Sequence, residues 1–207
     1  MRKLVIIFFV VVSCEQNKEW IYLFDGETID GWRGYNSEIM PPGWIVEDGI
    51  LTFETERRLE KEYKGGRDII YFKEEFENFE LYLEWKISEG GNSGILYHVK
   101  EGYDGPFEAS PEYQLIDDLM WGEINNSSLE NWQKTGADYA MYHAENTENL
   151  IKPAGEWNSS KIIFTPSKVE HWLNGQLIIS FVPWSEDWYD RKKSGKWKDY
   201  PDYGIYK

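Results

Sequence analysis

Apolar and polar residues alternate along several short stretches of this chain, and a period of two is typical of β-strands that bury one face. The clearest stretch covers residues 79–88 (FELYLEWKIS), in which every second residue is apolar. The dipeptides Asp48-Gly49 and Asn174-Gly175 separate neighbouring stretches, and glycine in such a connection accepts the positive φ that a tight hairpin requires. The other expected strands cover residues 44–47, 50–54, 161–165, 169–173 and 176–181.

One short helix is expected near the C-terminal end of the sequence. Ser185 is suited to cap its start, Glu186-Asp187 fall in its first turn, Lys192-Lys193 fall in its last turn, and Gly195 follows. The residues at 128–134 allow a second helical turn. Many short strands, tight turns and few helices predict an all-β fold, an antiparallel two-sheet β-sandwich with one or two short helices.

The first 19 residues differ in pattern from the rest of the chain. Arg2 and Lys3 precede nine consecutive apolar residues, too few for a helix across a bilayer, which needs about 20. The sequence VVSC at 11–14 resembles the cleavage box of lipoprotein signal peptides. We therefore expect residues 1–19 to be a signal peptide and polar tether, with cleavage before Cys14 and a lipid on its sulfur.

This reading predicts an exported domain over residues 20–207, held by its lipid at the periplasmic face or the outer membrane of the cell envelope. The lipid would be its only contact with the membrane. The alternative reading of Cys14 is a buried core cysteine. Because Cys14 is the single cysteine of the sequence, the domain has no internal disulfide and must rely on its apolar core.

The charge and the aromatic content narrow the choice of ligands. The sequence has 22 basic and 37 acidic residues and a net charge of −15, which argues against binding to nucleic acid. An acidic protein suits a neutral ligand or a cation, although the charge can also serve solubility alone. The 11 Trp, 14 Tyr and 10 Phe residues can fill a sandwich core or stack on the C–H faces of sugars.

Polar residues without an obvious packing role recur at strand spacing between residues 90 and 118. A glycine-rich loop at 90–94 precedes an expected strand at 95–100, and another strand starts at Glu112. On a regular strand Glu112 and Gln114 point to the same side about 6.6 Å apart, so both can touch one sugar.

Three neighbouring residues are candidates for binding a sugar. Asn92 and Ser93 can bond to hydroxyl groups, although Asn92 can also simply tolerate the left-handed geometry of a tight turn. Trp121 follows the acidic strand in an expected loop, where its ring can lie beneath a sugar.

Six segments resemble, in the same order, the 3-keto-disaccharide hydrolase domain family. They are WIYLFDGETIDGW (20–32), FELYLEWKISEGGNSGILYH (79–98), EYQLIDD (112–118), TGADY (135–139), KPAGEWN (152–158) and HWLNG (171–175). The resemblance implies a concanavalin-like jelly roll and an exported bacterial protein that degrades glycans. Family members continue beyond the position of Lys207 through closing strands, so we expect this chain to lack its last strands.

The substrate implied by the resemblance is an oligosaccharide or glycoside with a ketone at C3. Such a ketone acidifies the C2 proton, so a base can form an enolate that expels the C1 oxygen before water adds back. Glu112 is the candidate base, with Gln114 as its orienting or sugar-binding neighbour. His98 can act as an acid or enolate partner, or can be a surface histidine. Arg67 can bind an anion, or can form an exposed ion pair with Asp68.

Two other functions stay open. The spacing Glu-x-Gln-x-x-Asp from Glu112 to Asp117 is similar to the catalytic strand of laminarinase-like glycosidases, provided that a β-bulge returns Asp117 to the face of Glu112. In that reading both carboxyl groups are catalytic, although Gln114 replaces the central acid of the motif. The third candidate is a non-catalytic carbohydrate-binding domain, because jelly rolls often serve only to bind.

A divalent metal ion is a possible cofactor. His98, Glu112 and Asp117 can converge as mixed nitrogen and oxygen ligands. The sequence contains no tight ligand motif such as His-Glu-x-x-His. The identity of a metal, and the need for one, are therefore left open.

Overall fold

In the residues that the structure describes, the protein is mostly β-structure with two short α-helices. The computed structural model describes residues 3–11, 20–55, 67–144 and 147–205. The strands are β1 (Lys3–Val11), β2 (Trp20–Tyr22), β3 (Trp32–Gly34), β4 (Trp44–Glu47), β5 (Ile50–Glu54), β6 (Ile69–Tyr71), β7 (Phe79–Lys86), β8 (Asn92–Leu96), β9 (Glu112–Ile116), β10 (Asn158–Thr165), β11 (Lys168–Leu173) and β12 (Gln176–Phe181). The helices are α2 (Trp121–Asn125) and α3 (Glu186–Ser194), with 3₁₀ helices at Pro106–Glu108, Asn131–Gln133 and Lys196–Asp199.

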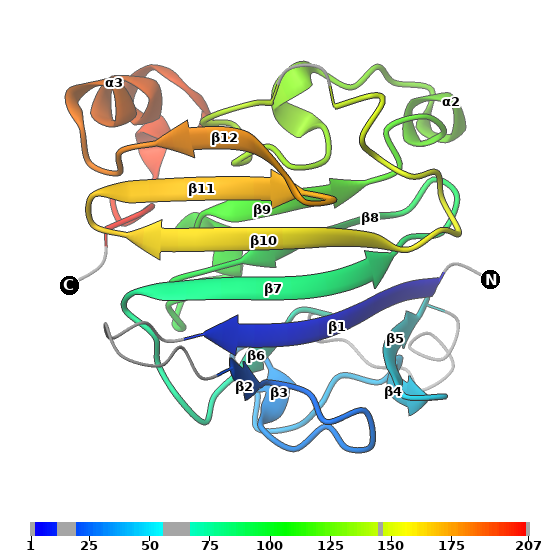
Figure 1. Cartoon of the computed structure of the whole chain (residues 1–207). Coiled ribbons are helices and arrows are strands. Elements are labelled where there is room, and N and C mark those ends of the chain that lie inside the picture. Colours follow the sequence, from blue (N-terminus) through cyan, green and yellow to red (C-terminus); the bar gives the residue numbers. More distant parts are fainter. Residues whose placement is uncertain (1–2, 12–19, 56–66, 145–146, 206–207) are drawn as a thin grey trace.

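The strands form one large and two small antiparallel sheets. The eight-stranded sheet has the order β12-β11-β10-β7-β1-β5-β4, and β2 pairs with β1. The small sheets are β3–β6 and β8–β9. Figure 1 shows β8 and β9 behind the large sheet, at the level of β7, β10 and β11. The all-β prediction is therefore confirmed, and so is the antiparallel pairing.

The predicted hairpins form where the glycine-containing dipeptides occur. Strands β4 and β5 pair on either side of a turn at Asp48 and Gly49, whose φ angles are 53° and 77°. Asn174 and Gly175 connect β11 to β12 with φ angles of 47° and 83°. Strand β7 buries every second residue as its pattern predicts, and it ends at Lys86, two residues before the expected end. The predicted burial of one face of this strand is confirmed.

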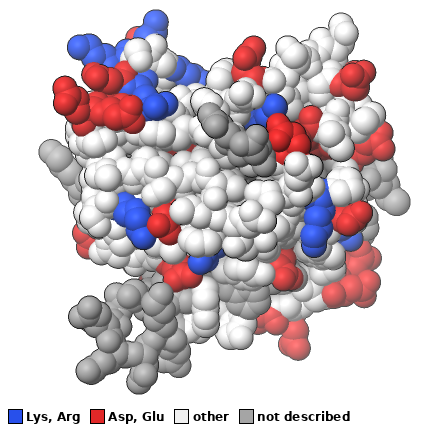
Figure 2. Space-filling view, turned by 45° about the horizontal axis from the view of Figure 1, so that its top comes forward, with Lys and Arg blue, Asp and Glu red and all other residues white. Residues whose placement is uncertain are grey.

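Helix α3 follows its sequence signals closely. The Ser185 hydroxyl oxygen accepts a hydrogen bond from the Trp188 backbone N–H, which satisfies one of the free donors of the first turn. Asp187 and Arg191, one turn apart, form an ion pair of 2.9 Å. Figure 2 shows basic and acidic side chains gathered together over the corner of the molecule where α3 lies. The charge on this corner is therefore mixed.

The main core joins the large sheet to the β8–β9 sheet. Trp85 on β7 is fully buried, and its indole N–H donates to the Ser160 hydroxyl on β10 at 2.9 Å. Burying aromatic and aliphatic side chains of this size stabilises the fold by about 1.5–3 kcal/mol each. The buried residues shared by the two sheets include Leu83, Trp85, Ile95, Tyr97, Tyr113, Leu115, Ile162 and Phe164. A second cluster of Met141, Trp188, Trp197 and Tyr203 packs beneath α3.

The expected loop and strand at 90–100 are shifted in the structure. The turn lies at Glu89 and Gly90 and is closed by a bond from the Gly91 N–H to the Ser88 carbonyl. The strand runs over Asn92–Leu96 instead of 95–100. The carboxylate of Asp117 accepts from the Gly90 N–H and the Asp117 N–H donates to the Gly91 carbonyl, so the turn is held close to β9. The pairing of β8 with β9 therefore begins at Asn92 and Ile116, inside the segment that was expected to be a glycine-rich loop. Helix α2 was not expected, and the turn allowed at 128–134 is the 3₁₀ helix Asn131–Gln133.

Part of the predicted leader lies in the large sheet. Strand β1 pairs with β7 on one side and with β5 on the other. Residues 12–19, which include Cys14, lie outside the described residues, so the leader, the lipid anchor and the domain boundary at residue 20 stay predictions. No helix in the described ranges is long and apolar enough to cross a membrane.

Candidate active site

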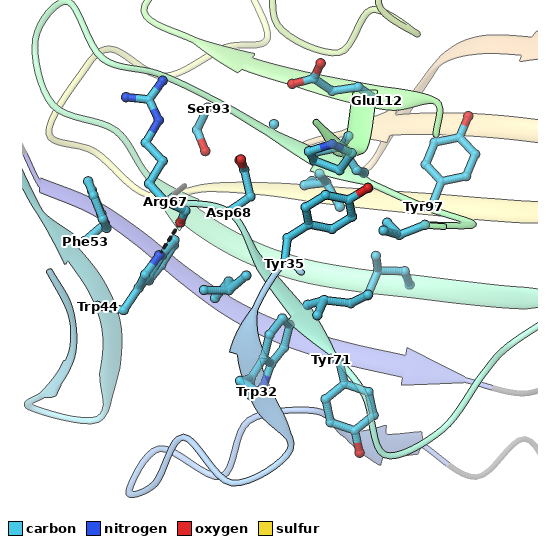
Figure 3. A pocket seen from close by; sticks show the side chains of 18 of the residues that line it. Trp32, Tyr35, Trp44, Phe53, Arg67, Asp68, Tyr71, Ser93, Tyr97 and Glu112 are labelled. Atoms are coloured by element: carbon cyan, nitrogen blue, oxygen red, sulfur yellow. Dashed lines mark hydrogen bonds between the residues drawn. The ribbon is translucent and has the colours of Figure 1, made fainter. Parts of the chain in front are cut away.

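A large cavity opens beside the β3–β6 and β8–β9 sheets. Its volume is about 1330 Å³, and residues from both small sheets and from the segment after β8 line it. Figure 3 shows Glu112, Ser93, Asp68 and Arg67 toward one end, while Trp32, Trp44, Phe53 and Tyr71 lie toward the other. Sugar sites combine these two properties, because ring faces stack on aromatics while hydroxyl groups need polar partners.

Glu112 is a half-buried carboxyl group on the wall of this cavity. It is the first residue of β9 and pairs with Leu96 on β8. Its carboxylate lies over Gly94, two residues before Leu96 on the same strand. Burial raises the pKa of Glu112 to about 7; the positive charge of Lys196 opposes this rise and the negative charge of Asp68 adds to it. A carboxyl group with a pKa near neutral is suited to accept and return a proton.

Lys196 is held near Glu112 by aromatic rings. Its Nζ lies 4.3 Å from the ring centroid of Tyr139 and 4.9 Å from that of Trp197. The Tyr139 backbone N–H donates to the Glu112 carbonyl at 2.9 Å, so the ring that contacts the ammonium belongs to a residue bonded to Glu112. This arrangement places a cation where it favours the charged form of Glu112.

Arg67 and Asp68 come from the start of β6. The Trp44 indole N–H donates to the Arg67 carbonyl at 2.7 Å and fixes this backbone against β4. Both side chains are exposed, and both line the cavity. Figure 3 shows them extending toward the end of the cavity where Glu112 lies. The predicted anion-binding role of Arg67 is compatible with this position and stays a prediction.

Asn92 and Ser93 lie on β8 and line the cavity, as expected of sugar-binding residues. Gln114 pairs with Gly94 across the sheet but is buried, and it does not line the cavity. Its side-chain amide donates to the side-chain Oδ1 of Asn92 at 3.4 Å. The geometry therefore disfavours direct sugar binding by Gln114. It favours a role in positioning the side chain of Asn92.

His98 lies just after β8 and lines the cavity wall. Its backbone is left-handed, with φ of 52°, and its ring packs 4.1 Å from the centroid of Phe164. Burial lowers the pKa of His98 to about 4. The imidazole is consequently neutral near pH 7, which disfavours the role of a cationic acid and leaves that of a neutral hydrogen-bonding group.

Asp117 has a structural position. Its Oδ2 accepts from the Gly90 N–H at 2.8 Å, and its Oδ1 accepts from the Leu119 and Met120 N–H groups at 3.2 and 3.3 Å. Asp117 does not line the cavity. The pairing of β8 with β9 runs from Asn92–Ile116 to Leu96–Glu112 without a shift, so the β-bulge required by the laminarinase-like reading is not formed.

The metal ligand set considered from the sequence is likewise not assembled. Glu112 and His98 line the cavity, whereas the Asp117 carboxylate is turned to backbone amides. In the part of the chain that the structure describes, no group of three or more His, Cys, Asp or Glu residues is placed to hold a metal ion.

Trp121 opens helix α2 and is half-buried at the edge of the cavity, as its predicted sugar-binding role requires. Sequence reasoning missed Tyr35, whose hydroxyl donates to the Lys100 carbonyl at 2.8 Å across the cavity wall. It also missed the two-pronged pair of Arg33 with Glu101, with N–O distances of 2.6 and 2.5 Å. These partners are separated by 65 and 68 residues, and nothing in the local pattern connects them.

Comparisons with known proteins point in one direction. The family model described as "3-keto-alpha-glucoside-1,2-lyase-like domain" matches residues 19–202. A 3-keto-disaccharide hydrolase of Bacteroides thetaiotaomicron is 35% identical over 192 residues, which cover 86% of this chain and 63% of that protein. The chain thus spans a little less than two thirds of that relative's length.

A solved structure from Parabacteroides distasonis ATCC 8503 is also similar. It is 44% identical, has a TM-score of 0.78, and covers 90% of this chain and 82% of its own. Its protein carries the provisional name glycosyl hydrolase.

Proposed function

Because this chain belongs to the 3-keto-alpha-glucoside-1,2-lyase-like domain family, we propose that it cleaves 3-keto-glycosides, including 3-keto-disaccharides, with Glu112 as the base. The single observation that carries the proposal is a half-buried carboxyl group on the wall of a large cavity, with its pKa raised to about 7. The similar hydrolase of Bacteroides thetaiotaomicron supports the choice of substrate.

The reaction begins with proton transfer from C2 of the sugar to the Glu112 carboxylate. The C2–H electron pair forms the enolate of the C3 ketone, and the enolate then expels the C1 oxygen as the C1–O bond breaks. The leaving oxygen takes up a proton from solvent, which gives an alcohol and a sugar with a double bond between C1 and C2. Water then adds its oxygen to C1 and releases one proton to solvent, while the Glu112 carboxylic acid returns a proton to C2 and becomes a carboxylate again.

Neighbouring side chains have separate roles in this scheme. Arg67 and Ser93, on the cavity wall, stabilise the enolate oxygen through a positive charge and a hydroxyl donor. Asn92, held by Gln114, binds a sugar hydroxyl. Trp121 provides an apolar face for a ring at the cavity edge.

Ordinary two-carboxylate hydrolysis is the less favoured alternative because Asp117 is engaged by three backbone N–H groups. We further propose the concanavalin-like jelly roll as the architecture, supported by the core shared between the large sheet and β8–β9. Export and lipid anchoring through Cys14 are also proposals, supported by the leader-like pattern of residues 1–14.

The experiment compares a 3-keto-glucoside with its unoxidised parent in heavy water, followed by NMR. Cleavage of the ketone alone, with deuterium appearing at C2, is the expected result. Glu112→Gln should lower kcat/KM by about 10²–10⁴-fold, the usual contribution of a general base. Glu156→Gln, the same change at an exposed site outside the cavity, should leave activity unchanged.

Three results contradict the proposal. Cleavage of the unoxidised parent indicates a conventional glycosidase, and binding without turnover indicates a carbohydrate-binding domain. Full activity of Glu112→Gln removes Glu112 as the base.

A further inference from the structure

A second carboxyl group, Asp138, lies beside Glu112 but takes no part in the scheme above. It forms a β-bridge with Tyr113, the residue after Glu112 on β9. The residues on either side of Asp138 also bond to this strand: the Tyr139 N–H donates to the Glu112 carbonyl at 2.9 Å, and the Gln114 N–H donates to the Ala137 carbonyl at 3.0 Å. The backbone of Asp138 is therefore fixed to the strand that carries the base.

The Asp138 carboxyl group is buried, with 1% of the residue exposed. Its Oδ1 accepts a hydrogen bond from the Tyr97 hydroxyl at 3.2 Å. Its Oδ2 is buried without a hydrogen-bond partner among the described residues. No ion pair with Asp138 is found among residues 20–55, 67–144 and 147–205. A charged carboxylate is costly in such a position, because nothing compensates for its lost hydration.

The groups packed around Asp138 do not supply a positive charge. Tyr97 comes from the end of β8, Glu112 and Tyr113 from β9, and Tyr142 from the turn that forms the second bridge to Asp138. His171 on β11 packs against the Tyr97 and Tyr113 rings, and burial lowers its pKa to about 4, so it is neutral near pH 7. Two cations lie in the surrounding structure. Lys196 acts on Glu112, and Arg191 lies over the Tyr142 ring at 4.4 Å; neither is among the groups that shift the pKa of Asp138.

These surroundings determine which of the two carboxyl groups, Glu112 or Asp138, loses its proton first. Burial raises the pKa of Asp138 to about 8, the Tyr97 hydrogen bond partly offsets that rise, and the charge of Glu112 adds to it. Glu112, which has Lys196 nearby, loses its proton first. The second ionisation then has to create a buried charge next to an existing one.

We propose that Asp138 is a positioning residue that remains a neutral carboxylic acid while Glu112 carries the charge, and that its ionisation at alkaline pH turns cleavage off. This inference rests on the proposed function of Glu112. A second negative charge beside the base opposes the build-up of charge on the enolate, so turnover falls once Asp138 loses its proton. Asp138 thereby gives the enzyme its alkaline limit.

The first test measures ionisation without using activity. Protein labelled with ¹³C at the Asp side-chain carboxyl carbon is titrated by NMR, and the Asp138 resonance is the one missing from Asp138→Asn. It should titrate near pH 8 in the wild type and at lower pH in Glu112→Gln, which removes the neighbouring charge. A resonance that titrates below pH 5, or one that Glu112→Gln leaves unmoved, overturns the inference even if the substrate assignment is right.

The second test measures kcat/KM against pH with the 3-keto-glucoside. The wild type should lose about tenfold per pH unit above its alkaline limit, as expected for a single ionisation. Asp138→Asn, which is isosteric with the neutral acid, should keep the acid limb and lose the alkaline limb. Tyr97→Phe should move the alkaline limb to higher pH, because it removes the donor that favours the charged form.

The two tests separate the proposals from each other. Lack of turnover with a normal Asp138 titration contradicts only the substrate assignment. An alkaline limb that persists in Asp138→Asn contradicts the role of Asp138 and leaves Glu112 as the base.

Discussion

The carboxylate of Glu112 occupies the space above Gly94 on the neighbouring strand. A β-carbon at position 94 would lie 1.8 Å from Glu112 Oε1 and 2.6 Å from its Cδ. Gly94 lies inside β8, where a side chain is normally favoured. The lack of a side chain at this position leaves room for the Glu112 carboxyl group. The glycine and the base are thus parts of one site.

Replacing Gly94 by Ala should displace the Glu112 carboxyl group from the cavity wall. Because a misplacement of about 1 Å can cost a hundredfold in rate, kcat should fall by roughly 10–100-fold. Overpacking should also lower the free energy of unfolding by about 1–3 kcal/mol. The measurements are steady-state kinetics and urea unfolding.

A double-mutant cycle provides the control for this prediction. In a Glu112→Ala background the collision is gone, so Gly94→Ala should cost much less stability than in the wild type. Equal costs in both backgrounds would show that the backbone, rather than the carboxyl group, disfavours a side chain at position 94.

The parts of the site that the sequence predicted are those carried by regular strands. Glu112 could be identified because side chains on a strand alternate, so its face follows from spacing. Asn92 was expected in a glycine-rich loop and instead begins strand β8. Gln114 shows the limit of this reasoning, since it shares the direction of Glu112 but is covered by the packed core. Burial depends on what lies above a strand, and the alternation does not contain that information.

Asp117, which was assigned another role, and Asp138, which was missed, each have a contact distant in sequence. Asp117 has the spacing of a catalytic acid, but three backbone N–H groups of the two adjoining turns bind its carboxylate. Asp138 lies in a loop without a strand pattern, and only its bridge to Tyr113 brings it beside Glu112. Such neighbours follow from topology, which local periodicity leaves undetermined.

Two charges near Glu112 should move its pKa in opposite directions. Lys196→Met removes the positive charge, so the acid limb of the kcat/KM profile should shift to higher pH. Asp68→Asn removes a negative charge and should shift it to lower pH. Each shift should be roughly a few tenths of a pH unit, because solvent screens both partners. Shifts of the same sign in the two variants would contradict this electrostatic assignment.

Asp117→Asn separates a structural carboxylate from a catalytic one. The amide nitrogen cannot accept the hydrogen bonds that the carboxylate receives from the Gly90 turn and the start of α2. The free energy of unfolding should fall by about 1–3 kcal/mol, while kcat of the folded protein stays within about tenfold of the wild type. Glu112→Gln should give the reverse pattern, so the two variants act as controls for each other. A loss of kcat of a thousandfold in Asp117→Asn with unchanged stability would restore the two-carboxylate mechanism.

His98 and His171 should remain neutral well into the acid range. Burial lowers the pKa of each to about 4, so neither protonates near the usual imidazole value of 6.5. Titration of ¹⁵N-labelled protein checks this, with each resonance assigned by its absence from a His98→Gln or His171→Gln variant. Because charging a buried imidazole is unfavourable, the stability contributed by these residues should be lost as the pH falls from 6.5 toward 4. A His98 signal that titrates near pH 6.5 would return to this residue the role of a cationic acid.

Asp138 should affect the pH dependence of stability in the opposite direction. Its pKa is raised from 3.8 to about 8 on folding, so the folded chain binds one proton more than the unfolded chain between these values. The contribution is complete below about pH 4 and decreases as the pH rises through 8, at up to about 1.4 kcal/mol per pH unit. Asp138→Asn has no such proton, so its free energy of unfolding should fall less steeply from pH 5 to pH 8, as measured by urea unfolding. Asp104→Asn, an exposed change of the same kind, should leave the wild-type slope intact. Parallel curves for the wild type and Asp138→Asn would mean that Asp138 is ionised in the folded protein, and the alkaline limit of catalysis would then need another group.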